Sequence, residues 1–370
     1  MRIGIDARMY GSCAATGIGV YIQALIDELI SQDKTNQYFI FLREPVYSSW
    51  QPVGNNVTKI KADINWYSLA EQVKLPRLLK KYNLDLMHFP HFNVPIFYRR
   101  NYIVTIHDIT PKFFPGPLAK KYFWRRWAYD FIFRRGLKRA KKIIAISLHT
   151  KNNLIKYFKV NSEKIIVIYP GVIVRRPVGS SQAELLIAFG VSKPFLFYIG
   201  VWRDHKNLPG LVAAFNILKA EFKLDLQLVL GGQPDRRYPE ILAAINRSEF
   251  RSDIILPGFI PEADLSTWYA AAKLFILPSF CEGFGLVAIE SLAQGTPVVG
   301  SSTTSLPEIL GDSALYFNPD NPADMALVIK KVLTDVELAK NLVEFGQKQL
   351  LKYNWSKTAS ATLALYNAII

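Results

Sequence analysis

Short apolar runs rich in β-forming residues alternate with helical patterns along the whole chain, and this alternation limits the possible folds most. Many runs are continuously apolar, as expected for parallel strands covered on both faces. Alternating strands and helices are typical of a doubly wound α/β sheet. The expected strands lie near residues 3–6, 38–42, 85–89, 103–106, 143–146 and 165–168, and again near 195–200, 227–231, 254–256, 274–277, 297–300 and 314–317.

Two such series in one chain predict two Rossmann-like, doubly wound parallel-sheet domains that face each other across a cleft. A chain of 370 residues is long enough for two domains. The pattern is interrupted between Pro170 and Ser181. We therefore expect an N-terminal domain over 1–172 and a C-terminal domain over 173–355, with a last helix over 356–370 that packs back on the first domain.

The excess of positive charge lies entirely in the first half. Residues 1–175 contain 28 Lys and Arg against 11 Asp and Glu, whereas the remaining residues contain 17 against 19. This asymmetry predicts an anionic partner for the first half: a membrane, a phosphorylated ligand or a nucleic acid. The absence of a long apolar run, of a signal-peptide pattern and of a disulfide framework (the cysteines are Cys13 and Cys281) predicts a cytoplasmic protein.

The first candidate site is the segment 281–290, Cys-Glu-Gly-Phe-Gly-Leu-Val-Ala-Ile-Glu, which follows the expected strand 274–277. Its two glycines permit close backbone approach, and a helix that begins at Leu286 would offer backbone N–H groups to a phosphate. Glu282 could accept hydrogen bonds from sugar hydroxyls, and Glu290 could hold a ribose. The alternative is a common glycine-rich turn with two solvated glutamates.

The second candidate site is the segment 198–207, Tyr-Ile-Gly-Val-Trp-Arg-Asp-His-Lys-Asn, which runs from the end of the expected strand 195–200 into the loop after it. Arg203 and Lys206 are three residues apart and could clamp a diphosphate through charge-assisted hydrogen bonds. Because the charge on a diphosphate grows as it leaves, these cations would stabilise the transition state more than the ground state. The alternative is a solvated pair of surface cations.

Glu282 and Glu290 enclose seven residues, and this Glu-x7-Glu pattern resembles retaining glycosyltransferase family 4, whose members have the GT-B fold. The resemblance covers essentially the whole chain, because further short motifs stand in the order that the family shows. They are Gly-Ile-Gly at 17–19, Pro-Gly-Val at 170–172, Gly-Gly at 231–232, Pro-Gly at 257–258, Gly-Thr-Pro-Val-Val at 295–299 and Leu-Pro-Glu at 306–308, together with Gly200 and Asn207 in the segments above.

The resemblance implies transfer of a hexose from a UDP-glucose or GDP-mannose type of donor to a saccharide or lipid-linked acceptor in polysaccharide biosynthesis. It implies that the donor's own phosphate oxygen takes the acceptor proton. The catalytic residues that it implies are His107, Arg203, Lys206 and Glu282. The donor-binding residues that it implies are Gly19, Gly200, Arg203, Lys206, Glu282, Gly283, Phe284, Gly285, Leu286 and Glu290.

Histidines follow two of the expected first-half strands. His107 could hydrogen-bond a sugar hydroxyl or a backbone carbonyl, and the resemblance favours the sugar; Asp108 could orient His107 or meet the acceptor. The spacing of His88 and His91 could suggest a metal pair, but no Cys or carboxylate is adjacent, so we interpret both as loop residues near the cleft. Since no Asp-x-Asp occurs, we expect no metal and no other cofactor, with the cations taking the role of a bridging metal.

The segment 118–142 contains ten Lys or Arg, one acidic residue and seven aromatic residues. Such a stretch can lie on an anionic membrane surface, which would place the protein on the inner face of the plasma membrane. The alternative is a helix with its aromatics in the core. Three other readings of the chain are a nucleotide-sugar epimerase, a catalytically inactive scaffold and a nucleic-acid-binding protein; the last is not expected, because no known binding motif occurs.

Overall fold

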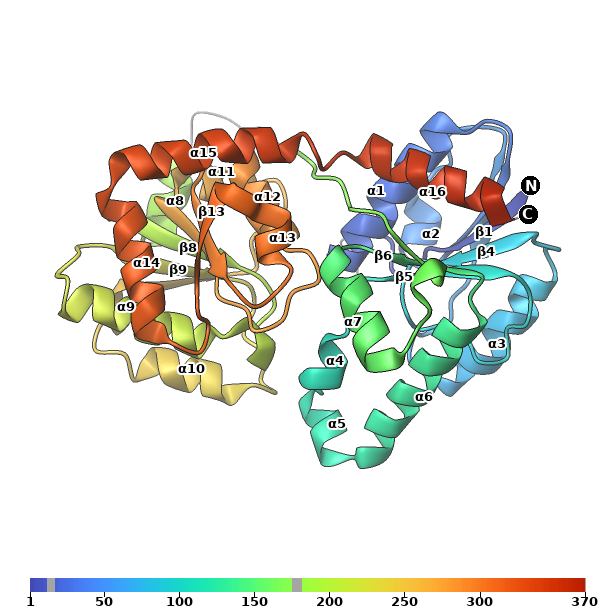
Figure 1. Ribbon diagram of the computed structural model, residues 1–370, viewed down its shortest axis with the longest axis horizontal. Helices are drawn as coiled ribbons and strands as arrows, with labels where there is room; N and C mark the ends of the chain where they lie inside the picture. The colour runs from blue at the N-terminus through green and yellow to red at the C-terminus, as the bar shows by residue number, and fades with distance from the viewer. Residues whose placement is uncertain (12–16, 175–181, 370) are drawn as a thin grey trace. The chain divides into compact units, whose positions relative to one another are not determined.

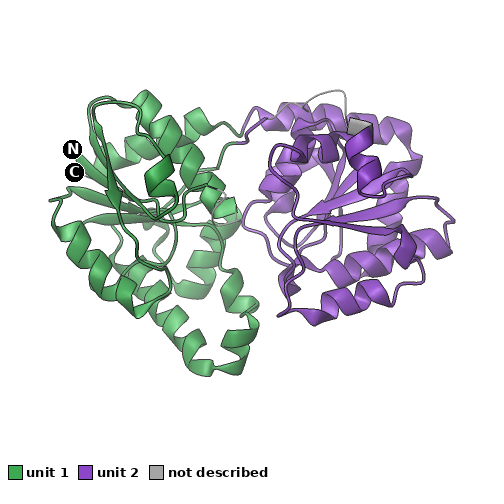
Figure 2. Cartoon of the chain, turned by 180° about the vertical axis from the view of Figure 1, so that it is seen from behind, with its two compact units in different colours: residues 1–171, 353–370 green, residues 172–352 purple. Residues whose placement is uncertain are grey.

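The computed structural model of the protein describes residues 1–11, 17–174 and 182–369, in which the chain forms two parallel α/β sheets (Figure 1). The predicted fold class is confirmed. The chain divides into two compact units: unit 1 comprises residues 1–171 and 353–370, and unit 2 comprises residues 172–352 (Figure 2). Cys13 and residues 175–181, where the pattern of strands and helices is interrupted, lie outside the described residues.

Unit 1 contains a seven-stranded sheet in the order β3-β2-β1-β4-β5-β6-β7, with every neighbouring pair parallel. β3 is the one strand that the sequence pattern did not predict. Only Val57 and Ile60 of its five residues, Val-Thr-Lys-Ile-Lys, are buried at this edge of the sheet, so β3 lacks the continuous apolar run of a central strand. The strands are β1 (Arg2–Asp6), β2 (Gln37–Leu42), β3 (Val57–Lys61), β4 (Leu86–Phe89), β5 (Tyr102–Ile106), β6 (Lys142–Ala145) and β7 (Ile165–Val167).

Helices cover both faces of this sheet (Figure 1). α1 (Gly17–Gln32) and the C-terminal α16 (Trp355–Ile369) pack against each other on one face. On the other face, α3 (Leu69–Lys80), α6 (Phe123–Arg139) and α7 (Leu148–Phe158) share one hydrophobic cluster with the strands. The short elements of unit 1 are α2 (Val46–Ser49), α4 (Thr110–Phe113), α5 (Pro117–Lys121) and η2 (Ser162–Lys164).

Unit 2 contains a six-stranded parallel sheet in the order β10-β9-β8-β11-β12-β13. Its strands are β8 (Phe195–Ile199), β9 (Gln227–Gly231), β10 (Ile254–Gly258), β11 (Leu274–Leu277), β12 (Val298–Ser301) and β13 (Ala314–Phe317). Its helices are α8 (Gln182–Ala188), η3 (Asp204–Lys206), α9 (Leu208–Ala220), α10 (Pro239–Asn246), η4 (Arg251–Asp253), α11 (Leu265–Ala271), α12 (Leu286–Ala293), α13 (Leu306–Leu310), η5 (Gly311–Ser313), α14 (Pro322–Thr334) and α15 (Val336–Leu350).

The strand order of each sheet reverses at one point: between β1 and β4 in unit 1, and between β8 and β11 in unit 2. In open α/β sheets, ligands bind beyond the carboxyl ends of the strands at such a switch point. The loops after these four strands are therefore where binding residues are expected. Within the described part of the chain, no helix is long and apolar enough to span a bilayer.

Candidate active site

The two segments singled out in the second half follow the two strands at the switch point of unit 2. Arg203 and Lys206 come after β8, and Glu282 comes after β11. β8 and β11 are neighbours in the sheet, so the loops that carry Lys206 and Glu282, which are 76 positions apart in sequence, begin side by side. The fold therefore brings together the two motifs that the sequence shows separately.

Lys206 and Glu282 form an ion pair in which the ammonium donates to Oε1 of the carboxylate. The hydroxyl of Ser279 donates to the same oxygen at 2.8 Å. The side chains of Lys206 and Glu282 are 15% and 12% exposed, so the pair is shielded but still reachable from solvent. Among the described residues, none bonds to Oε2 of Glu282, which leaves this oxygen available for a hydroxyl group.

Asn207 holds the two loops together. Its backbone is in the left-handed region, with φ of 54°, which Asn tolerates better than most residues. Its amide nitrogen donates to the carbonyl oxygens of Pro278 at 3.2 Å and Pro319 at 2.8 Å. Because Asn207 adjoins Lys206, and Pro278 lies four residues before Glu282, these bonds fix the distance between the paired side chains.

Arg203 differs from Lys206 in being exposed. Within the described part of the chain, its guanidinium makes no ion pair or side-chain hydrogen bond, so it is free to bind an anion. His205 lies between the two cations and is buried. Burial, reinforced by the charge of Lys206, lowers the pKa of His205 to about 4, so this imidazole is neutral at pH 7.

The amino end of α12 supplies the third part of the site. Gly285 precedes the helix with φ of 92°, a conformation that favours glycine, and it is buried with Gly283 and Phe284. The helix begins at Leu286, as predicted, and its dipole favours an anion at this end. On the same helix, Oε2 of Glu290 accepts a hydrogen bond from the hydroxyl of Tyr269 at 3.0 Å.

The structure places Gly200 and Gly19 where backbone segments pass very close to one another. Gly200 directly follows β8, and its carbonyl oxygen would be 2.1 Å from a Cβ atom on Gly232. Gly19 lies in the first turn of α1, where an added Cβ would be 2.1 Å from the carbonyl oxygen of Gly11. Gly19 therefore has a packing reason to be glycine, whatever its part in binding.

His107 follows β5 in unit 1, as predicted, and one of its two ring nitrogens already makes a hydrogen bond within the protein. Nε2 is 2.9 Å from the carbonyl oxygen of Pro90, so this nitrogen must carry the proton. Burial lowers the pKa of His107, against the effect of this hydrogen bond and of Asp108. The neutral ring therefore presents Nδ1 as an acceptor, while Oδ1 of Asp108 accepts from the backbone N–H of Thr110 at 2.8 Å.

The interpretation of His88 as a loop residue is wrong. His88 is an interior residue of β4 and is fully buried. Its Nδ1 is 2.7 Å from the hydroxyl of Tyr366, and its Nε2 is 2.8 Å from the hydroxyl of Thr105. Burial lowers the pKa of both His88 and His91 to about 3. His91 does lie in the loop after β4, where its Nε2 is 3.3 Å from the hydroxyl of Tyr67.

Sequence reasoning missed a buried ionic network that follows β1 at the switch point of unit 1. The guanidinium of Arg8 binds both carboxylate oxygens of Asp6 at 2.7 Å and Oε1 of Glu71 at 2.6 Å. Oε2 of Glu71 accepts from the amide of Asn93 at 2.5 Å and from the backbone of Tyr67 at 2.8 Å. The 63 positions between Arg8 and Glu71 gave no local pattern from which to predict this pair.

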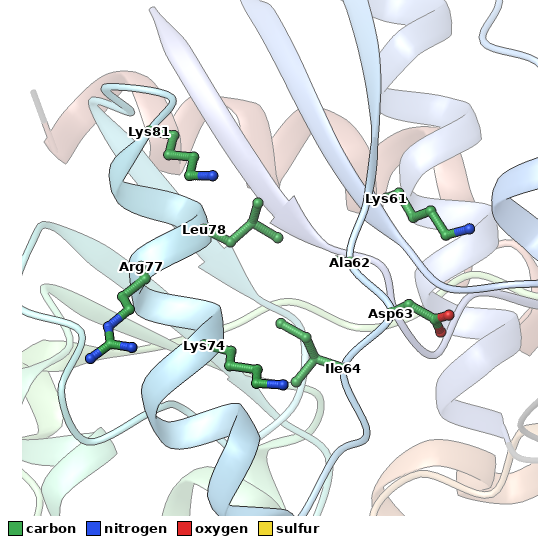
Figure 3. A pocket seen from close by; sticks show the side chains of 8 residues that line it. All are labelled: Lys61, Ala62, Asp63, Ile64, Lys74, Arg77, Leu78 and Lys81. Atoms are coloured by element: carbon green, nitrogen blue, oxygen red, sulfur yellow. The ribbon is translucent and has the colours of Figure 1, made fainter.

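A basic hollow of about 270 Å³ lies in unit 1 between the end of β3 and α3 (Figure 3). None of the site residues predicted above lines it. No three of the described His, Cys, Asp and Glu side chains are grouped so as to hold a metal ion. The residues that line the hollow are Lys61, Ala62, Asp63, Ile64, Lys74, Arg77, Leu78 and Lys81.

Two protein-family models match the chain, one in each half. The model described as "Glycosyltransferase Family 4" matches residues 15–176, and the model described as "Glycosyl transferases group 1" matches residues 187–349. O-antigen chain mannosyltransferase B of Escherichia coli is 26% identical over 378 aligned positions, which cover 96% of both chains.

Solved structures have the same fold. Sucrose-phosphate synthase from Thermosynechococcus elongatus is 20% identical, with a TM-score of 0.81 over 100% of this chain and 99% of that one. Anabaena HepE in complex with UDP and glucose is 17% identical, with a TM-score of 0.75 over 99% of each chain. At these identities the likeness supports the fold alone. With both halves matched by glycosyltransferase models, the predictions of an enzyme and of its class are confirmed, and the chain belongs to the family 4-like glycosyltransferases with the GT-B fold.

Proposed function

We propose that the protein transfers a hexose from a nucleoside diphosphate hexose to a glycan or lipid-linked acceptor in polysaccharide biosynthesis. The observation that carries this proposal is the juxtaposition of Lys206, Glu282 and the exposed Arg203 at the switch point of unit 2. Cations for a diphosphate and a carboxylate for sugar hydroxyls are the groups that such a donor requires. A mannosyltransferase relative favours a GDP-mannose type of donor, and the HepE complex keeps UDP-glucose as the alternative.

In this mechanism, the bond between the anomeric carbon and the diphosphate oxygen breaks, and a bond forms between the same carbon and the acceptor oxygen. The leaving diphosphate keeps the electron pair, and Arg203 and Lys206 stabilise its growing charge. We propose retention of configuration, with the acceptor proton passing to an oxygen of the donor's own phosphate. The two cations take the role of a bridging metal, so transfer needs no divalent ion.

Donor binding would redistribute the contacts of Lys206. Without donor, its ammonium binds Glu282. A diphosphate brings more negative charge to Lys206 than one carboxylate does, and it also reaches Arg203. Glu282, still held by Ser279 through Oε1, then has Oε2 for hydroxyls of the donor sugar. The N-terminus of α12 would meet the phosphate, and Glu290 the ribose.

The roles of unit 1 are proposed on the same basis. His107 would accept a hydrogen bond from a donor-sugar hydroxyl through Nδ1, since its Nε2 is bound to Pro90. Gly19 would let the start of α1 approach the donor. The acceptor would bind to unit 1, and the protein would work in the cytoplasm, at the inner face of the plasma membrane.

The test is a thermal-shift screen with UDP, GDP, ADP and their common sugar conjugates, in EDTA. A ligand at a hundred times its dissociation constant stabilises the native state by about 2.7 kcal/mol. We expect one nucleoside diphosphate to raise the melting temperature, and Arg203→Ala to reduce that rise. Incubation of the stabilising donor alone distinguishes transfer from epimerisation. No shift with any nucleotide, or a shift only with added Mg²⁺, would contradict the proposed donor site.

A further inference from the structure

Helix α6 has two apolar faces, only one of which packs on unit 1. Its inner face includes Phe133 and Leu137, which are 1% and 3% exposed and belong to the hydrophobic cluster. Trp124, Trp127 and Phe131 follow the spacing i, i+3, i+7, which forms one stripe on a helix. At about 100° per residue, this stripe lies on the side opposite Phe133. The three side chains are 53%, 67% and 42% exposed, so the stripe faces solvent.

The stripe continues into the connection that precedes α6. Leu118, Tyr122 and Phe123 are 46%, 40% and 84% exposed. In Figure 1, α5 and the first turns of α6 extend beyond the sheet of unit 1. A contiguous group of exposed large apolar side chains on a soluble domain marks an interaction site. We call this group the α5–α6 surface: Leu118, Tyr122, Phe123, Trp124, Trp127 and Phe131.

Cations are interleaved with these side chains. Lys120, Lys121, Arg125 and Arg126 are exposed, and the guanidinium of Arg125 lies 5.1 Å from the ring centroid of Trp124. The one acidic residue in 118–142, Asp130, is neutralised by Arg134 at 3.0 Å. The α5–α6 surface is therefore both apolar and strongly positive. Its partner must have negative charges next to an apolar region into which the aromatic side chains can insert.

We propose that the α5–α6 surface binds an anionic lipid bilayer, with its aromatic side chains at the level of the headgroups. Tryptophan and tyrosine prefer this zone, and basic residues bind anionic headgroups. A single-stranded nucleic acid fits the surface less well, since its bases need open ring faces. The rings of Trp127 and Phe131 are instead stacked on each other, with centroids 5.4 Å apart, and Leu118 offers no ring.

The proposed lipid-binding region is shorter than the segment 118–142 that the sequence composition predicts. Beyond Phe131, buried side chains such as Phe133 and Leu137 anchor the helix to unit 1. Lipid binding would hold unit 1 at the membrane, where a lipid-linked acceptor resides; this last consequence rests on the proposed function. The binding itself does not, because it needs neither donor nor turnover.

The experiment is co-sedimentation of the full chain with two kinds of vesicle, one of phosphatidylcholine alone and one that also contains 30% phosphatidylglycerol. The buffer has about physiological ionic strength. We expect binding to the anionic vesicles and little to the neutral ones. Two variants separate the contribution of the apolar side chains to vesicle binding from that of the basic side chains. The apolar variant is Trp124→Ser/Trp127→Ser/Phe131→Ser, and the charge variant is Lys120→Glu/Lys121→Glu/Arg125→Glu/Arg126→Glu.

Each basic residue near an anionic surface raises partitioning about fivefold, so the charge variant should lose at least a hundredfold. The matched control reverses four charges on α3 and its C-cap in the same unit: Lys74→Glu/Arg77→Glu/Lys80→Glu/Lys81→Glu. This control should keep most of the binding that the charge variant loses. Circular dichroism melts identify any variant that fails to fold, and the apolar variant then provides the independent test.

Four outcomes would overturn the proposal. They are absence of wild-type binding to anionic vesicles, an equal loss in the α3 control, and normal binding in both α5–α6 variants. The fourth is a wild-type protein that does not bind vesicles but forms a dimer or binds RNA, and that loses this dimer or this RNA binding in the apolar variant. Release of nucleoside diphosphate with a soluble acceptor is measured in parallel. Normal vesicle binding without release would contradict the proposed function alone, and release without vesicle binding would contradict this inference alone.

Discussion

Each unit places an ion pair at the switch point of its sheet, and the two pairs are built differently. In unit 1, Arg8 and Glu71 are 4% and 0% exposed, and both oxygens of Glu71 accept hydrogen bonds. In unit 2, Lys206 and Glu282 are 15% and 12% exposed, and Oε2 of Glu282 has no partner among the described residues. The first pair is saturated, whereas the second has capacity for a ligand.

The difference in exposure to water suits the pair in unit 1 to stabilising the fold and the pair in unit 2 to binding a ligand. Breaking a buried pair leaves a charge that water cannot reach, so the cost appears as lost stability. Breaking a pair that is near solvent costs the fold little, because water replaces the missing partner. The pair in unit 2 can therefore exchange one partner for a ligand, and the pair in unit 1 cannot.

The largest expected effect is on the stability of unit 1. Glu71→Ala leaves Arg8 beside Asp6 alone and removes the partner of Asn93. We expect the free energy of unfolding to fall by about 3 to 5 kcal/mol, as when one partner of a buried ion pair is removed. Urea unfolding followed by circular dichroism measures the change. A loss below about 1 kcal/mol would show that the network does not hold unit 1 together.

The next effect is on turnover. Lys206→Ala should lower kcat about 10²- to 10³-fold, the range for removing a group that binds charge developed in the transition state. Glu282→Ala should also lower kcat by orders of magnitude, because the donor sugar then loses the carboxylate that holds its hydroxyls in place. Unfolding free energies should fall by less than for Glu71→Ala, because the Lys206–Glu282 pair keeps some contact with water whereas Glu71 has none. Turnover is measured as release of nucleoside diphosphate. Wild-type rates in either variant would remove these residues from the site, and a loss of stability as large as for Glu71→Ala would remove the contrast between the pairs.

The contrast also explains what the sequence could predict. Lys206 and Glu282 lie in short motifs directly after apolar strands, and strand order alone brings them together. Arg8 and Glu71 meet across 63 positions through a crossover, and no local pattern encodes that pairing. Likewise, β3 was not predicted because, as an edge strand, it has few apolar residues. Tyr269 was not predicted because its hydrogen bond to Glu290 depends on how α11 packs.

A smaller effect should appear at acid pH, again from a buried polar group of unit 1. His88 has a pKa of about 3 in the folded protein, against about 6.5 when unfolded. The unfolded state therefore binds the proton first, so stability is complete above pH 6.5 and falls as the pH drops from 6.5 toward 3. His88 contributes up to about 1.4 kcal/mol per pH unit in that window.

His88→Gln tests this, because it keeps a polar side chain and removes the titration. Unfolding in urea between pH 7 and pH 4.5 should show a shallower decline for the variant than for the wild type. The other histidines whose pKa falls, such as His205 with a pKa of about 4, should leave part of the slope in place. An identical slope in variant and wild type would mean that His88 is not the neutral, hydrogen-bonded group of β4.

The smallest effect concerns Arg203, the exposed member of the site. Arg203→Ala should leave stability unchanged and weaken binding of the preferred nucleoside diphosphate about tenfold, since a hydrogen bond to a charged group contributes about 1.5 kcal/mol or more. Arg203→Lys keeps the charge but not the planar fork, and should recover part of the affinity. Calorimetric titration at two salt concentrations measures both. Because an exposed cation is screened by salt, the gap between wild type and Arg203→Ala should narrow as salt rises. A gap independent of salt would mean that Arg203 acts through packing, and the assignment of the free cation to the diphosphate would then fail while that of the Lys206–Glu282 pair could still hold.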